Sequence, residues 1–155
     1  MSETSIVLAD ATDAQMLRNI SVIAFKSDFE KYGSYPPGIE SLEWHLSRIE
    51  EGHYYKIKYN NDLAGGICLI PKDAKHIEIK YFFISTKFQN KKIGSKVIKL
   101  IENQYKHITK WSLVTPYKEY RNHYFYEKLG YIKSGEYCPN SNSEFKVFEY
   151  IKIRS

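Results

Sequence analysis

Two kinds of hydrophobic pattern alternate along the chain. Apolar residues three or four positions apart predict amphipathic helices, and short runs rich in β-branched and aromatic residues predict strands. The helical spacing occurs at residues 12–24, 41–51, 93–105 and 117–130. The strand pattern occurs at residues 5–8, 53–59, 63–71, 76–84, 110–115, 131–138 and 145–153.

The resulting order, β-α-α-β-β-β-α-β-α-β-β, predicts an α/β protein with a mixed sheet. The order begins with antiparallel hairpins, whose turns we place at residues 60–62 and 72–73. A long loop at residues 31–41 contains two glycines and two prolines and separates the first two helices. Gly130 is expected to end the helix predicted at residues 117–130.

Composition and charge limit the number of domains, the partners and the location that we expect for the protein. The chain has 155 residues and a formal charge of +5, with its lysines scattered, so we expect one domain over residues 1–155 and no nucleic-acid partner. Two distant cysteines indicate neither a disulfide scaffold nor a metal site. No leader or membrane-spanning pattern is present. We therefore expect a cytoplasmic protein without membrane contact.

The stretch "FQNKKIGSKVIKLIENQY" places Lys91 and Lys92 at the start of a helix. Free N–H groups there favour an anion, and cations normally belong at the other end. Gly94 permits close backbone approach. The pattern therefore predicts a phosphate site. An ordinary strand-to-helix connection with exposed lysines is the alternative.

Two segments resemble the GNAT superfamily of N-acetyltransferases. "QNKKIGSKVI" is similar to the family's acyl-CoA pyrophosphate loop, Gln/Arg-x-x-Gly-x-Gly/Ala. Gln89 and Gly94 match it, but Lys92 replaces the first glycine, which costs backbone freedom. "NHYFYEKLGYIKSG" resembles the family's second common segment more closely. The element order also agrees from Ile6 onward.

The resemblance implies a single N-acetyltransferase domain that uses acetyl-CoA and no metal. It implies a mostly antiparallel sheet, splayed between strands 4 and 5 and flanked by about four helices. The implied cofactor-binding residues are Phe83, Ile84, Gln89, Asn90, Lys91, Lys92, Ile93, Gly94, Ser95 and Asn122. The main-chain groups of Phe83 and Ile84 are expected to form hydrogen bonds with the thioester and the pantetheine arm. Asn122 is equally well explained as a helix-capping amide.

The implied catalytic residues are Glu78 and Tyr126. A protonated amine must lose a proton before it attacks, and the resemblance implies that Glu78 takes it through water. Pairing with Lys80 or a cross-strand lysine is the structural alternative. The resemblance implies that Tyr126 protonates the leaving thiolate. With 14 tyrosines in the chain, a packing role is its alternative.

The resemblance implies direct transfer of an acetyl group to a primary amine, carried by a small molecule or a peptide. We expect this amine to enter beside the loop of residues 28–40. An acyl-CoA-binding module without turnover is the alternative, favoured by the lysine at position 92. The five histidines lack ligand spacing, so we expect surface or packing roles. Cys68 is expected to be a buried thiol. The oligomeric state is open, although dimers are the commonest assembly.

Overall fold

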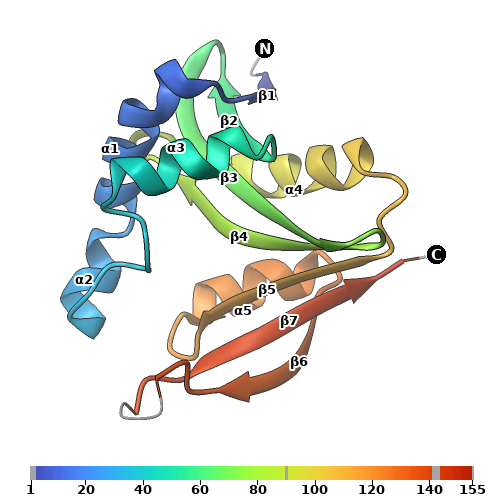
Figure 1. The fold of residues 1–155 in the computed structure, drawn as a ribbon. Coiled ribbons are helices and arrows are strands. Elements are labelled where there is room, and N and C mark those ends of the chain that lie inside the picture. The colour runs from blue at the N-terminus through green and yellow to red at the C-terminus, as the bar shows by residue number, and fades with distance from the viewer. Residues whose placement is uncertain (1–2, 90, 141–143, 155) are drawn as a thin grey trace. The chain divides into compact units, whose positions relative to one another are not determined.

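The structure is a computed structural model that describes residues 3–89, 91–140 and 144–154. It contains one seven-stranded sheet in the order β1-β2-β3-β4-β5-β7-β6 (Figure 1). The strands are β1 (Thr4–Leu8), β2 (Tyr54–Tyr59), β3 (Asp62–Asp73), β4 (His76–Ile84), β5 (Lys110–Pro116), β6 (Ile132–Tyr137) and β7 (Val147–Ile153). The helices are α1 (Ala14–Ala24), α2 (Lys26–Tyr32), α3 (Leu42–Glu50), α4 (Ile93–Gln104) and α5 (Tyr120–Lys128), with short 3-10 turns η1 (Ala11–Asp13) and η2 (Thr86–Phe88). The predicted mixed α/β fold is therefore confirmed.

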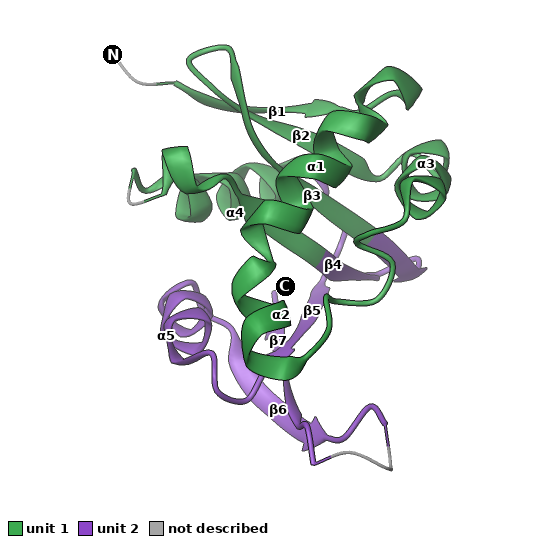
Figure 2. Ribbon diagram, turned by 90° about the vertical axis from the view of Figure 1, so that its left-hand side faces the viewer, with its two compact units in different colours: residues 1–69, 81–104 green, residues 70–80, 105–155 purple. Residues whose placement is uncertain are grey.

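The chain divides into two compact units (Figure 2). Unit 1 comprises residues 1–69 and 81–104, and unit 2 comprises residues 70–80 and 105–155. The expectation of a single domain over residues 1–155 stays a prediction. None of the described helices is both long and apolar enough to cross a membrane.

Strand β2 separates the two faces of the sheet in unit 1. Successive residues of a strand point to opposite faces. Tyr54 contacts His45 of α3, whereas the hydroxyl of Tyr55 accepts a hydrogen bond from Gln104 of α4 at 3.0 Å. Helices α3 and α4 therefore cover opposite faces. The core on the α3 side also contains Leu17 and the buried Cys68, as predicted for that thiol.

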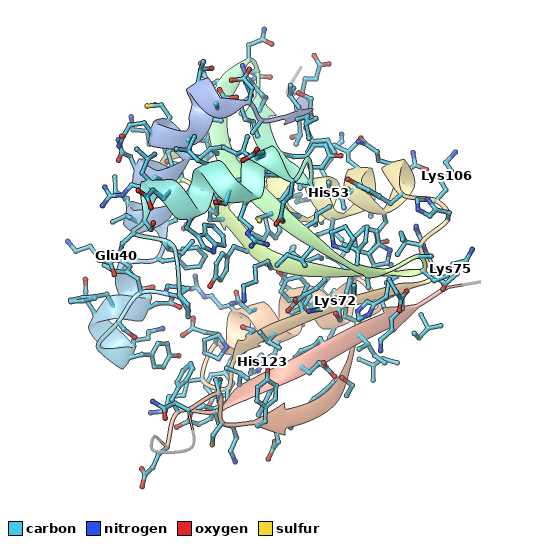
Figure 3. The ribbon with its side chains drawn as sticks, in the orientation of Figure 1. Glu40, His53, Lys72, Lys75, Lys106 and His123 are labelled. Carbon is cyan, nitrogen blue, oxygen red and sulfur yellow. The ribbon has the colours of Figure 1, made fainter. Side chains whose placement is uncertain are left out.

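In unit 2, helix α5 covers one face of the strands β5 and β7. The ring of His123 stacks on Phe148 and Tyr150 of β7, with centroid distances of 5.0 and 5.7 Å (Figure 3). The hydroxyl of Tyr150 donates to Glu127 of α5 at 2.7 Å. β4 pairs in parallel with β5 over residues 76–78 and 110–112, and this short pairing agrees with the expected splay between strands 4 and 5.

Helix α2 was not predicted from the sequence. Residues 31–32, expected in the loop, lie in this helix, so there are five described α-helices rather than about four. Helix α2 has no buried residue and hence no apolar stripe that would reveal it. It ends at Gly33, which adopts φ of 81° and donates its N–H to the carbonyl of Phe29.

One predicted turn is confirmed and the other is wrong. Asn60 and Asn61 have φ of 51° and 72°, as expected for a tight hairpin turn between β2 and β3. Lys72 and Asp73 instead belong to β3, and the turn follows at residues 74–75. The Asp73 carboxylate accepts the N–H of Lys75 at 2.8 Å, so this aspartate supports the turn from the strand end.

Candidate active site

The predicted phosphate loop connects β4 to α4 in unit 1. The amide of Gln89 donates from Nε2 to the carbonyl of Ile84 at 3.3 Å, which ties the loop to the end of the strand. Ser95 donates from its hydroxyl to the carbonyl of Lys92 at 3.4 Å. Ile93 is buried and fixes the first turn of the helix. Asn90 lies outside the described residues.

Lys92, at the position of the family's first glycine, has a backbone conformation that favours glycine. Its φ is 61°, in the left-handed region. This region costs a residue with a Cβ about 1–2 kcal/mol, whereas glycine enters it freely. The lysine therefore adds a charged side chain to the loop at a local energetic cost.

A hollow of about 760 Å³ opens beside this loop and along α4. Four lysines line it, and no carboxylate of the described residues does. The polar lining consists mainly of Lys91, Lys92, Ser95, Lys96, Lys99 and Asn103. The hollow is basic and begins at the positive end of the helix, so its part beside the loop is electrostatically suited to a phosphorylated ligand.

Phe83 presents only its backbone to a ligand. Its side chain is buried, with its ring 6.1 Å from that of Phe25 in an edge contact. Its carbonyl lies so close to Gly65 of β3 that a Cβ on this glycine would be 2.1 Å from the oxygen. Sequence reasoning did not single out Gly65, although the Gly-Gly pair within a predicted strand was a visible signal.

Tyr126 is buried in unit 2, on helix α5. Its ring makes edge contacts with Phe125 at 5.0 Å and with Tyr131 at 5.6 Å. Burial raises the pKa of the Tyr126 hydroxyl above its usual value. The phenol is therefore protonated at neutral pH, which a general acid requires. These contacts are equally those of a packing tyrosine.

Glu78 is ion-paired in unit 2. Its carboxylate lies 3.4 Å from Nζ of Lys72 on β3, with side-chain exposures of 16 and 48 per cent respectively (Figure 3). Lys72 is therefore a cross-strand lysine of the kind predicted as the structural alternative. A partly exposed pair of this kind contributes about 1 kcal/mol or less. The proposed catalytic role of Glu78 stays a prediction.

Glu78 points away from the face that α5 covers. Thr115 and Phe148 are paired across β5 and β7, and Phe148 carries His123 of α5. Alternation places Trp111 on that same face, and Trp111 is the partner of Ile77. Glu78, one residue further along, therefore faces the opposite side of the unit 2 strands.

Asn122 links helix α5 to strand β5. Its side-chain amide donates to the hydroxyl of Thr115 at 3.1 Å. Glu119 occupies the cap position and Asn122 lies in the first turn, so the capping interpretation of this asparagine is wrong. The reason is that the helix starts at Tyr120, three residues earlier than a cap at Asn122 requires. Contact with the cofactor stays a prediction.

The loop after α2 is anchored through three main-chain carbonyls. Tyr81 donates its hydroxyl to Pro37 at 2.7 Å, and Arg18 donates from Nε to Glu40 at 2.9 Å (Figure 3). The third carbonyl, that of Ile39, accepts from His45 Nε2 at 2.8 Å. Sequence reasoning did not find these anchors, because nothing in the pattern brings residues 18, 45 and 81 together.

His45 and His123 are packing residues, as predicted. His45 is fully buried, and His123 is nearly so and lies 3.1 Å from the Pro116 carbonyl through Nε2. The pKa of His45 is lowered, mainly by burial. The charge of Arg18 also lowers this pKa, whereas the hydrogen bond to Ile39 raises it. The neutral imidazole is therefore the form that fits this site.

Solved structures with the same fold include several acetyltransferases. The PaiA N-acetyltransferase of Thermoplasma acidophilum, in complex with coenzyme A, has a TM-score of 0.78 at 17% identity, covering 98% of this chain and 99% of that one. A GNAT family acetyltransferase of Elizabethkingia anophelis with acetyl-CoA bound has a TM-score of 0.71 at 21% identity, covering 97% and 98%. The ribosomal-protein-S18-alanine N-acetyltransferase of Escherichia coli has a TM-score of 0.76 at 12% identity, covering 97% and 94%. At these identities the likeness concerns the fold alone.

Sequence comparison supplies the family. The uncharacterized protein YrkN of Bacillus subtilis (strain 168) is 32% identical over 79 residues, which are 50% of this chain and 43% of that protein. The match therefore spans less than half of that relative's length. The sequence model of the Acetyltransferase (GNAT) family matches residues 15–131, most of the chain. The chain belongs to the GNAT acetyltransferase family.

Proposed function

We propose that the chain is an N-acetyltransferase that moves an acetyl group from acetyl-CoA to a primary amine by direct attack. The observation that carries this proposal is the β4–α4 loop. It keeps a left-handed backbone at Lys92 and opens beside a hollow lined by four lysines. Free N–H groups at the start of α4, together with these lysines, are suited to the diphosphate of the co-substrate.

The residues assigned to the cofactor by the family pattern divide between the two units. In unit 1 they are the main chain of Phe83 and Ile84 and the loop residues 89–95, including Asn90. In unit 2 the candidate is Asn122, through an amide that already donates to Thr115. Further contact of Asn122 with the pantetheine arm would use its carbonyl oxygen, which accepts hydrogen bonds.

The reaction forms one C–N bond and breaks one C–S bond. Glu78 takes the proton that the amine loses, through water, and Tyr126 gives its phenolic proton to the departing thiolate. Glu78 lies on β4 and Tyr126 on α5, both in unit 2. Glu78 faces away from the side that α5 covers, so in this proposal the base and the acid approach the reacting carbonyl from different sides of these strands.

The acceptor enters, in this proposal, beside the loop of residues 33–40. Small amines, polyamines, antibiotic amines and the amines of peptides are all compatible with the sequence. A cytoplasmic setting is part of this proposal, and a homodimer is the assembly to examine first. The loop is held at three carbonyls, which suits a wall of a binding site that must keep its shape.

The test is thiol release from acetyl-CoA in the presence of a panel of these amines. Release that depends on both the amine and the protein supports the proposal. An acyl-CoA-binding module is the second candidate, because Lys92 departs from the family glycine. Stabilisation against heat by acetyl-CoA, with no release for any amine, would support the module and count against the enzyme.

A further inference from the structure

The lysine-lined hollow extends beyond the phosphate loop. Lys91 and Lys92 precede α4, whereas Lys96 and Lys99 lie within it. Lys96 and Lys99 are three residues apart within the helix, so their side chains lie along one side of it. Both line the same hollow as Lys91 and Lys92. The opposite side of α4 is buried and includes Ile93, Val97 and Ile101.

This row of like charges is unfavourable when nothing binds to it. Like charges three or four residues apart on a helix, as with Lys96 and Lys99, repel each other by about a few tenths of a kcal/mol. No acidic residue lies in the first turn of α4, and no carboxylate of the described chain lines the hollow. A bound anion would remove this repulsion. On a helix face that is only solvated, charges of alternating sign typically balance each other instead.

The number of positive charges exceeds what a diphosphate needs. The diphosphate bridge of coenzyme A carries about two negative charges, and its 3′-phosphate monoester adds about 1.5 to 2 at neutral pH. The four lysines of the hollow match this total. The 3′-phosphate is joined to the diphosphate through a single ribose, so a ligand held at the loop carries it towards neighbouring side chains.

We propose that Lys96 and Lys99 bind the 3′-phosphate of coenzyme A and make the protein prefer coenzyme A to its dephosphorylated form. This inference rests on the proposed function, because it assumes that the diphosphate lies at the loop. It adds two residues outside the family motif, and it assigns them a selective role rather than general attraction.

The experiment is calorimetric titration of the protein with coenzyme A and with dephospho-coenzyme A, which lacks only the 3′-phosphate. The variants are Lys96→Gln, Lys99→Gln and the double substitution. Lys75→Gln is the matched control, since it removes one exposed lysine in the turn between β3 and β4, outside the hollow (Figure 3). Urea unfolding of each variant verifies that the fold is intact.

We expect the wild type to bind coenzyme A about tenfold tighter than dephospho-coenzyme A. Each single substitution should weaken coenzyme A binding by about three- to fivefold, as for exposed ion pairs. The double variant should lose most of the preference while its affinity for dephospho-coenzyme A stays the same. The control should keep the wild-type preference.

Three outcomes would overturn the inference. Equal affinity of the wild type for both ligands would do so while leaving the proposed function intact. An equal loss of affinity for both ligands in the double variant would assign these lysines to the diphosphate instead. Failure of the wild type to bind either ligand would overturn the proposed function together with this inference.

Discussion

His45 donates a hydrogen bond from Nε2 to the carbonyl oxygen of Ile39, over 2.8 Å. Because a carbonyl only accepts, this contact fixes the tautomer with hydrogen on Nε2. Nδ1 then accepts from the hydroxyl of Tyr54 at 2.9 Å. All three residues are fully buried. A neutral imidazole thus satisfies every polar atom at this point, and an imidazolium would lose the bond from Tyr54.

The stability of the protein should therefore depend on the charge of His45. The pKa of His45 is lowered in the folded state, mainly by burial, so the unfolded chain takes up a proton first as the pH falls. The stabilisation is complete above the unfolded pKa of about 6.5 and is lost as the pH falls from there through the folded pKa. Urea unfolding between pH 8 and 5 should show this, with a slope of up to about 1.4 kcal/mol per pH unit from this group.

His45→Gln should remove that slope and lower the free energy of unfolding at pH 8 by about 1–3 kcal/mol, because the hydroxyl of Tyr54 loses its acceptor. Tyr54→Phe is the control, since it keeps the buried histidine and hence the pH dependence. If wild type and His45→Gln lose stability in parallel below pH 6.5, the dependence belongs to other groups.

Replacement of Lys92 by glycine should stabilise the protein. The left-handed backbone at Lys92 costs about 1–2 kcal/mol, and the added freedom of glycine in the unfolded chain returns about 0.5–1 kcal/mol of that. We expect a net gain of about 0.5–1 kcal/mol in urea unfolding. Lys91→Gly, at a position without positive φ, should instead destabilise the protein. Equal effects of both changes would contradict the role of the backbone.

Gly65→Ala should be strongly destabilising. The new Cβ would lie 2.1 Å from the carbonyl oxygen of Phe83, and backbone atoms cannot yield as a flexible side chain can. We expect a loss of about 2–4 kcal/mol in the free energy of unfolding. Gly135→Ala in β6 is the control, because nothing lies within 4 Å of the added atom. A loss below 1 kcal/mol at Gly65 would mean that β3 and β4 separate easily.

Tyr126→Phe tests the proposed general acid. The change keeps the ring contacts with Phe125 and Tyr131 and removes only the hydroxyl. We expect turnover with acetyl-CoA and a reactive amine to fall by about 10²- to 10⁴-fold, with little change in affinity for the co-substrate. Tyr124→Phe, exposed on the same helix, should keep wild-type turnover. Unchanged turnover in Tyr126→Phe at every pH would assign Tyr126 to packing.

Glu78→Gln and Lys72→Gln separate the base from the ion pair. If Glu78 is the base, its loss lowers turnover most at low pH, where the amine is largely protonated, and loss of Lys72 does not. If the pair is structural, both changes cost the same small amount of stability, about 0.2–1 kcal/mol. Initial rates across pH and urea unfolding of both variants distinguish the two cases.

Most of the strands were predictable from the sequence because they bury one or both faces and so show an apolar pattern, although β1 and β6 have no buried residue. The bounds of β4 agree with the prediction at both ends, and α4 begins at the expected Ile93. Helix α2 gave no such signal, since a helix without buried residues has no apolar stripe. The anchors of the loop at residues 37–40 were equally hidden, because they join residues that only the folded chain brings together.

The candidate site likewise has features that the sequence predicted and features that only the structure shows. The family resemblance and the helix pattern predicted the phosphate loop, and the charge of Lys92 was evident. Its left-handed backbone was not, because residue preference alone predicts a right-handed or extended conformation for lysine. Pairing with Lys80 or an unnamed cross-strand lysine was predicted for Glu78, and only the folded chain shows that Lys72 of β3 is a partner.

The two neighbouring tyrosines of β2 restrict how this strand can pair. Tyr54 bonds to α3 on one face and Tyr55 bonds to α4 on the other. A slip by one residue would exchange the two faces and take both hydroxyls from their partners at once. Two independent hydrogen bonds, one to a helix on each face, thus specify the register of β2, and a shifted register would lose both of them.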